Sequence, residues 1–174
     1  VIGLVLDITE SQQYAEQLLR HSRHDDLTGL HNRRAGYELF ETYLAQSRER
    51  GAMLQVVMFD LDHFKRLNDL HGHQNGDRAI QHFAHILQGE LRESDLFFRW
   101  GGEEFLLLLP ETGRVDAVAL VRRLLSCFSE SRFVSDNGET IQLTCSAGIA
   151  SYPQEGDSIR ALVSAADKAM YRAK

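Results

Sequence analysis

The chain has 174 residues, of which 43% are hydrophobic and 25% are charged, which suits one well-packed domain with a short appendage better than two domains. Its formal net charge is −6, from 19 Lys and Arg against 25 Asp and Glu, so the surface as a whole does not favour binding to nucleic acid or to an anionic membrane. No apolar run approaches the roughly 20 residues that span a bilayer, so we expect no membrane segment in this chain.

The two cysteines, Cys127 and Cys145, lie in apolar stretches without the spacing of a metal site. We expect buried free thiols in a reducing compartment. The first residue is not Met, and the last helical pattern runs to Lys174. We therefore expect a fragment of a larger cytoplasmic protein, whose parent could be anchored in a membrane upstream.

The first residues are predicted to form an appendage. Residues 1–9 contain an apolar, strand-like run that ends in Asp7-Ile8-Thr9, and we expect them to be the last strand of an upstream domain. Thr9 and Gln12 fit a capping box, which predicts a polar connector helix over residues 10–24 that could pair with a second copy of itself. The main domain is then expected over residues 25–174.

Within residues 25–174, strand patterns alternate with helix patterns. A turn at residues 26–30 precedes a helix with Tyr37, Phe40 and Leu44 on one face, and a second helix is expected to open at Gly76-Asp77. The remaining expected helices cover residues 118–128 and 162–170. The expected strands are residues 54–59, 95–100, 105–109 and 143–151, with a hairpin at Asn137-Gly138. Such an order predicts an α/β domain with a mixed sheet covered by helices.

Two segments carry residues suited to phosphate chemistry. Asp60 directly follows a predicted buried strand, and the loop Gly101-Gly102-Glu103-Glu104 joins two predicted strands. If the two strand ends are neighbours, Asp60 and Glu103 face one site that could hold Mg²⁺ together with substrate phosphates. The alternative for the loop alone is a tight hairpin with solvated acids.

The residues after Asp60 add candidates for nucleotide recognition. Lys65 could offset negative charge that develops on a phosphate in the transition state. Asn68 and Asp77 together could bind the N–H groups and carbonyl of guanine, whereas adenine lacks the matching donors. The structural alternative makes Asn68 a turn residue and Asp77 the N-cap of the next helix.

Six sequence blocks together resemble the GGDEF family of diguanylate cyclases. They occur in the family's order over roughly residues 25–174, without large gaps. The blocks are residues 26–33 (Asp-Leu-Thr-Gly-Leu-x-Asn-Arg), 59–69 (Phe-Asp-Leu-Asp-x-Phe-Lys-x-x-Asn-Asp), 72–77 (Gly-His-x-x-Gly-Asp), 99–105 (Arg-x-Gly-Gly-Glu-Glu-Phe), 146–150 (Ser-Ala-Gly-Ile-Ala) and 166–174 (Ala-Asp-x-Ala-Met-Tyr-x-Ala-Lys). The N-terminal segment ending Asp7-Ile8-Thr9-Glu10 similarly resembles the exit of a PAS sensor domain.

The family resemblance implies a fold and a reaction. The fold is that of nucleotide cyclases and polymerase palms (α/β, or α+β): a mixed, mostly antiparallel five-stranded sheet surrounded by helices, plus a hairpin. The reaction condenses two GTP molecules into cyclic di-GMP and releases two pyrophosphates. It uses two Mg²⁺ ions in each active site, for which Mn²⁺ is a possible substitute, and it requires a homodimer because each domain holds one GTP.

The resemblance also assigns roles to individual residues. Glu103 accepts the proton of the attacking hydroxyl, and Lys65 stabilises the transition state. The expected metal ligands are Asp60, the backbone carbonyl of Leu61, Glu103 and, as a further candidate, Glu104. The expected substrate-binding residues are Asn68, His73, Asp77, His63, Phe64 and Lys174.

An Arg-x-x-Asp pair, Arg92 and Asp95, ends five residues before the first signature glycine. It matches the family's product-inhibition motif, with Arg123 at a helper position, and implies that cyclic di-GMP binds there as an inhibitor. A solvated helix end is the alternative.

Three functions remain open: an active diguanylate cyclase, a catalytically silent domain that binds GTP or cyclic di-GMP, and an interaction element that transmits upstream dimerisation. A cyclase acting on ATP is a weaker enzyme alternative, which the acidic Asp77 opposes.

Overall fold

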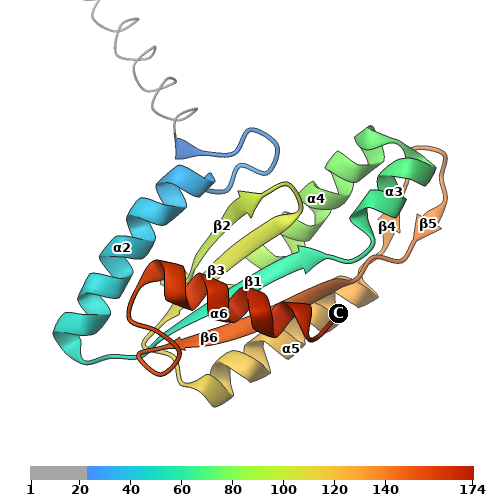
Figure 1. Ribbon diagram of the computed structural model, residues 1–174. Coiled ribbons are helices and arrows are strands. Elements are labelled where there is room, and N and C mark those ends of the chain that lie inside the picture. Colours follow the sequence, from blue (N-terminus) through green and yellow to red (C-terminus); the bar gives the residue numbers. More distant parts are fainter. Residues whose placement is uncertain (1–22) are drawn as a thin grey trace, which may run out of the picture.

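The computed structural model describes residues 23–174 (Figure 1). The expected upstream strand (1–9) and all but the last two residues of the expected connector helix (10–24) lie outside the described residues. The helices are α2 (Arg33–Arg50), α3 (Phe64–His71), α4 (His73–Gln88), α5 (Arg114–Glu130) and α6 (Ile159–Tyr171). The strands are β1 (Leu54–Leu61), β2 (Leu96–Gly101), β3 (Glu104–Pro110), β4 (Phe133–Val134), β5 (Thr140–Ile141) and β6 (Cys145–Tyr152).

The main sheet has four antiparallel strands in the order β2-β3-β1-β6. As the apolar run at residues 54–59 predicted, β1 is a buried central strand, paired with β3 on one side and with β6 on the other. Both of its faces are covered, which explains why its sequence is almost continuously apolar.

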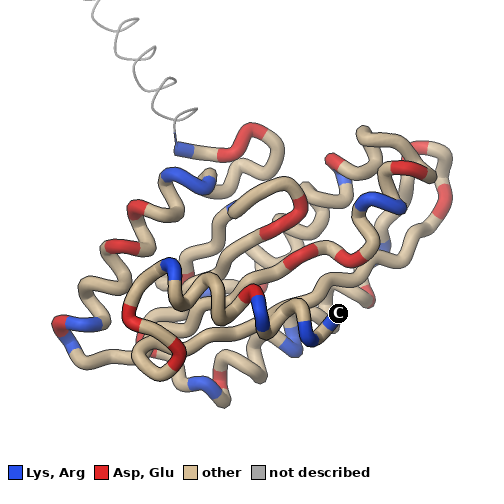
Figure 2. The backbone as a smooth tube through the Cα atoms, in the orientation of Figure 1, with Lys and Arg blue, Asp and Glu red and all other residues tan. Residues whose placement is uncertain are grey.

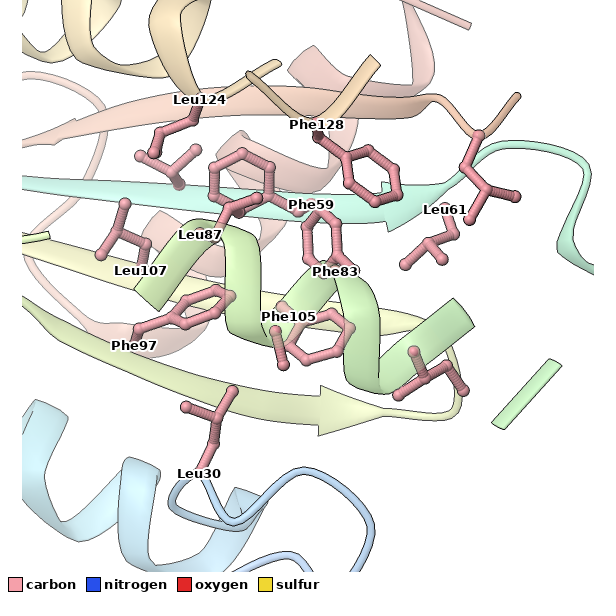
Figure 3. Close-up of a cluster of buried hydrophobic side chains, with 14 of the residues drawn as sticks. Leu30, Phe59, Leu61, Phe83, Leu87, Phe97, Phe105, Leu107, Leu124 and Phe128 are labelled. Atoms are coloured by element: carbon pink, nitrogen blue, oxygen red, sulfur yellow. The ribbon is translucent and has the colours of Figure 1, made fainter. Parts of the chain in front are cut away.

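Alternate side chains of the sheet enter two separate cores. Phe59, Phe105 and Leu107 pack with α4 and α5 on one face, where Phe83 and Phe97 complete an aromatic cluster (Figure 3). The next residues along the strands, such as Met58 and Leu106, pack with α2 and α6 on the other face. The result is a three-layered α+β domain, with α6 crossing in front of the sheet in Figure 1.

The α+β class and the antiparallel character of the sheet are confirmed, but one five-stranded mixed sheet is wrong for the described residues. Strands β4 and β5 pair only with each other, around the predicted turn at Asn137-Gly138. Each has two residues, which is too short to extend the main sheet. The one parallel feature in residues 23–174 is an isolated bridge between His31 and Phe98, which ends because Asn32 caps the start of α2.

Two helix assignments differ from the expectation. Residues 64–71, for which no helix was expected, form α3, and α4 begins at His73 rather than at Gly76-Asp77. The helix was missed because α3 has only eight residues, so Phe64, Leu67 and Leu70 repeat over barely two turns, too few to establish a helical period. Asn68 is therefore a helical residue and Asp77 lies inside α4, which excludes the turn and N-cap alternatives for them.

Smaller expectations fare unevenly. Phe40 and Leu44 are buried as expected, whereas Tyr37 on the same helix is 42% exposed. Cys127 and Cys145 are both free, and both are half-buried rather than fully buried. None of the helices in residues 23–174 is both long and apolar enough to cross a bilayer.

Candidate functional site

The end of β1 and the turn between β2 and β3 lie side by side, as the sequence predicted. Asp60 pairs with Glu104 in the β1–β3 register, and the N–H of Leu61 donates to the carbonyl of Glu103 at 3.4 Å. Figure 2 shows acidic residues at both of these places, at one edge of the sheet. The antiparallel pairing therefore brings together two acidic segments that are some forty positions apart in the sequence.

Two aspartates, Asp60 and Asp62, lie two positions apart at this edge, and they have different partners. The carboxylate of Asp62 accepts hydrogen bonds from the hydroxyls of Thr144 (2.8 Å) and Ser146 (2.7 Å), which tie it to the start of β6. Asp60 makes no such bond to β6, and its side chain is 14% exposed. The structure thus separates a carboxylate that is tied to β6, Asp62, from one that is not, Asp60.

The ammonium group of Lys174 donates to the carboxylate of Asp60. Partial burial alone would lower the pKa of Lys174, but the hydrogen bond to Asp60 and the negative charges of Asp60, Asp62 and Glu103 outweigh it, so the pKa is raised. The Lys174 ammonium group is therefore a cation that lies beside the acidic residues at this edge of the sheet. Lys174 was expected to contact phosphate, and its position beside Asp60 is compatible with that role.

Glu104 lies where a negative charge is unfavourable. Burial raises the pKa of its carboxyl group, and repulsion from Asp60, Asp167 and Glu103 raises it further, against the opposing effect of Arg33. A bound divalent cation would relieve this repulsion. The chemistry of the residues present therefore fits a metal ion.

The expected metal ligands are few, so an ion would need further ligands from substrate and water. Within residues 23–174, no group of three His, Cys, Asp or Glu side chains is arranged to hold a metal ion by itself. Mg²⁺ does not need such a cage, because it is usually bound by one or two carboxylates together with substrate phosphates and water. Asp60 and Glu103, with the backbone carbonyl of Leu61, supply a set of this kind.

The turn that carries Glu103 is held by an arginine that the sequence reasoning did not single out. Arg99 donates to both carboxylate oxygens of Asp25 at 2.9 Å, and to the carbonyl of Gly102 at 2.7 and 3.1 Å. Asp25 also accepts from the N–H and the hydroxyl of Thr28. Although burial alone would raise the pKa of Asp25, the hydrogen bonds from Thr28 and Arg99 and the charge of Arg99 lower it overall. The sequence signal for the turn at Asp25 was the spacing Asp-x-x-Thr, from Asp25 to Thr28, which is typical of turns.

The candidate base-reading residues lie on two adjoining helices. Asn68 is on α3 and Asp77 on α4, and the two helices meet where Gly76 faces the Asn68 side chain. A Cβ atom at Gly76 would lie 1.9 Å from Asn68 Oδ1, so only glycine allows this approach. Asn68 Oδ1 is buried and has no hydrogen-bond partner within residues 23–174, which leaves an acceptor for a ligand N–H.

The other predicted substrate residues surround the start of α3 and α4. His63 adopts a left-handed conformation (φ 56°) that turns the chain from β1 into α3, and no side-chain hydrogen bond caps that helix. Its first N–H groups, around Phe64, can therefore donate hydrogen bonds to an anion such as phosphate. Lys65 on α3 and His73 at the start of α4 are both exposed. They lie on the elements next to the acidic edge, with no contact that assigns them a partner.

A second set of predicted residues surrounds a separate cavity of about 550 Å³. Arg92, Asp95 and Arg123 all line it, together with residues of the loop that follows β3. The carboxylate of Asp95 accepts from the Arg92 N–H at 3.0 Å, and Arg123 pairs with Glu90 at 2.8 Å. The structure therefore brings the three candidates for product binding together: Arg92 and Asp95 from the segment before β2, and Arg123 from α5.

Comparisons with known proteins agree on one family. The family model described as "Diguanylate cyclase, GGDEF domain" matches residues 22–174. Diguanylate cyclase DgcM of Escherichia coli K12 is 39% identical over 174 residues, which are 100% of this chain and 41% of that protein. The chain thus spans about two fifths of the length of that relative.

Solved structures agree as well. The coiled coil and GGDEF domain of DgcB from Caulobacter crescentus, in complex with c-di-GMP, superposes with a TM-score of 0.89 at 25% identity, covering 98% of this chain and 90% of that one. The GGDEF domain of TpbB from Pseudomonas aeruginosa gives a TM-score of 0.82 at 37% identity, covering 87% of this chain and 88% of that one.

Proposed function

Because the chain belongs to the GGDEF family of diguanylate cyclase domains, we propose that it condenses two molecules of GTP into cyclic di-GMP and two pyrophosphates. The observation that carries the proposal is the juxtaposition of Asp60 and Leu61 with Glu103 at the edge of the sheet. A domain that had kept the fold alone would have no need of carboxylates at both Asp60 and Glu103.

The first step is attack on a phosphate. The 3′-hydroxyl oxygen of one GTP forms a bond to the α-phosphorus of the other, and the bond from that phosphorus to the bridging oxygen of pyrophosphate breaks. Glu103 accepts the proton of the attacking hydroxyl, and Lys65 offsets the charge on the phosphoryl oxygens. Mg²⁺ held by Asp60, Glu103 and the Leu61 carbonyl would supply Lewis-acid stabilisation of these charges when bound. A second identical step closes the ring.

Selection of GTP over ATP is assigned to Asn68 and Asp77. Together, Asn68 and Asp77 can accept hydrogen bonds from the N1–H and the amino group of guanine and donate one to its carbonyl. Support comes from the buried Asn68 acceptor without a partner in residues 23–174. Adenine offers an acceptor at N1, which an ionised Asp77 would repel. The phosphates would lie toward the first turn of α3 and Lys174.

The reaction needs two copies of the domain. Each acidic edge belongs to one nucleotide site, so two domains must face one another to join two GTP molecules. We therefore infer a homodimer as the active species, whose formation an upstream segment would control. The cavity between Arg92 and Arg123 is the corresponding candidate for feedback control, because two guanidinium groups and Asp95 can bind phosphate and a guanine edge.

The test is to incubate the purified chain with Mg²⁺ and either GTP or ATP, and to separate the products by chromatography. We expect cyclic di-GMP and pyrophosphate in a ratio of 1:2 from GTP, no cyclic dinucleotide from ATP, and a rate per chain that rises with protein concentration. The Glu103→Gln variant, close to the natural side chain in size, should bind GTP and lose at least about a hundredfold in rate. Bound but unconverted GTP in the natural chain would instead support the silent binding domain.

A further inference from the structure

A buried amide in α4 joins three elements that lie around the candidate base-reading residues. Asn75 is only 8% exposed, and it stands one residue before Gly76 and two before Asp77. Resting on the function proposed above, we propose that Asn75 is a positioning residue for guanine recognition. It fixes the distance between Asn68 and Asp77 by holding the end of α3 and the β4–β5 hairpin to α4.

The first contact of Asn75 is with the end of α3. Its Nδ2 donates to the carbonyl of His71, the last residue of that helix, at 2.8 Å. The last carbonyls of a helix have no partner within the helix, so this bond stabilises the end of α3 from outside. Asn68 lies within the same last turn, and its own carbonyl accepts from the N–H of Gly72. The position of Asn68 therefore depends on how this turn is held.

The second contact is with the hairpin. Asn75 Oδ1 accepts from the backbone N–H of Asp136 at 3.0 Å, so both ends of the amide are used. Arg78, one helical turn further along α4, donates to the carbonyl of Val134 at 2.9 Å and pairs with the Asp136 carboxylate. It also lies over the Phe133 ring, with 5.8 Å to the centroid. These contacts fasten a hairpin of only two residues per strand, which could not be stable by itself.

The third step connects this junction to the base. The Asn68 side chain packs closely against Gly76 of α4. A rotation or shift of α3 therefore changes the distance from Asn68 to Asp77 directly. Two groups that must bind one planar base tolerate little displacement, because a misplacement of about 1 Å can cost a large factor in binding. Without Asn75, the end of α3 would keep the Gly72 turn and the contact of His71 with the exposed Glu139 at 3.6 Å. The amide is thus suited to set specificity without touching the nucleotide.

A purely structural role makes a different prediction, which a matched control can separate. Gln55 is another buried amide with two hydrogen bonds, to the carbonyl of Thr112 (3.0 Å) and the hydroxyl of Ser151 (2.6 Å). It lies in β1 at the far end from Asp60. Loss of either amide removes a similar set of buried bonds, so both variants should lose similar stability. Only the Asn75 variant should alter nucleotide binding.

The experiment measures binding of α,β-methylene-GTP, whose carbon bridge cannot leave as pyrophosphate, by titration calorimetry with Mg²⁺. It also measures kcat and KM for GTP and for ITP, which lacks the amino group of guanine. For Asn75→Ala we expect the dissociation constant to rise about tenfold, kcat to change less than about twofold, and the preference for GTP over ITP to fall about threefold. Gln55→Ala should leave all three values within about twofold of the natural chain.

A second variant keeps the test decisive if Asn75→Ala does not fold. Arg78→Met removes the exposed part of the hairpin contact and retains an apolar stem over Phe133. It should raise the dissociation constant about threefold, and hydrogen exchange of residues 133–141 should become faster. Weaker binding without faster exchange in the hairpin would contradict the positioning role.

The outcomes separate the two proposals. If the natural chain neither binds α,β-methylene-GTP nor converts GTP, the proposed function fails and this inference fails with it. If the natural chain does both, and the Asn75 and Arg78 variants bind like it, only the inference is overturned. Equal weakening by Asn75→Ala and Gln55→Ala would also overturn it, because the effect would then follow from stability alone.

Discussion

Replacing Arg99 by methionine removes the link between Asp25, near the start of the domain, and the turn that carries Glu103. The natural side chain makes two bonds to the Asp25 carboxylate and two to the carbonyl of Gly102. Methionine retains an apolar stem of similar length without the guanidinium group. The change therefore isolates the hydrogen bonds and the charge.

The expected loss of stability follows from the burial of the ion pair. The side chains of Arg99 and Asp25 are 16% and 21% exposed. Breaking a fully buried pair costs about 3–5 kcal/mol, and exposed pairs contribute about 0–1 kcal/mol, so we expect a free energy of unfolding lower by about 2 kcal/mol. The Gly102 carbonyl can turn to water and should add little. The hydrogen bonds from Thr28 remain and limit the cost to Asp25.

Urea unfolding at pH 7 measures this difference, and Arg50→Met is the matched control. Arg50 pairs with Glu111 at 2.9 Å, with both side chains 62% exposed, so its loss should cost no more than about 0.5 kcal/mol. Because folding lowers the pKa of Asp25 below 3.8, the stabilisation is present above that pH and is lost as the pH falls through the folded-state pKa. The difference in stability between the two chains should thus shrink as the pH falls below 3.8.

Activity gives a second measure of the same link. A looser turn would leave Glu103 less well placed, and we expect kcat for GTP to fall about tenfold in Arg99→Met. A destabilisation no larger than that of Arg50→Met, together with an unchanged kcat, would refute the reasoning. The turn would then be held by its backbone pairing alone.

Three further variants test separate parts of the site. At pH values above 7, Glu104→Gln should raise the Tm, because folding raises the pKa of this carboxyl group and its charge destabilises the folded state. The gain in Tm should vanish as the pH falls below 4.5. A gain that persists at low pH in calorimetry would contradict this reasoning. Gly76→Ala places a Cβ atom against Asn68 Oδ1 and should weaken GTP binding by at least about tenfold. The control Gly89→Ala, whose Cβ would meet only ordinary contacts at 3.6 Å, should not weaken it. Equal affinities of the two variants for GTP would show that Asn68 moves freely. Arg92→Ala should raise the concentration of cyclic di-GMP that halves the rate by about tenfold or more, and an unchanged inhibition curve would remove Arg92 from the product site.

The α+β class and most strands followed from local sequence patterns. The apolar run at residues 54–59 was long enough for a strand and too short for a helix, and the structure has β1 there. The apolar runs either side of Gly101-Gly102 became β2 and β3 for the same reason. The eight-residue α3 escaped prediction because its stability comes from its contacts with α4 and the hairpin rather than from its own pattern.

The sequence by itself identified which residue types could do the chemistry, because the carboxylates of Asp60 and Glu103 each follow or separate strands in a recognisable order. Only the tertiary structure decided how they act together. The register of β1 with β3 and β6 leaves the Asp60 carboxylate without a bond to β6, while Ser146 holds Asp62. Lys174 then reaches Asp60 across 114 positions. Such pairings depend on distances through space between segments far apart in the chain, which no local pattern of residues contains.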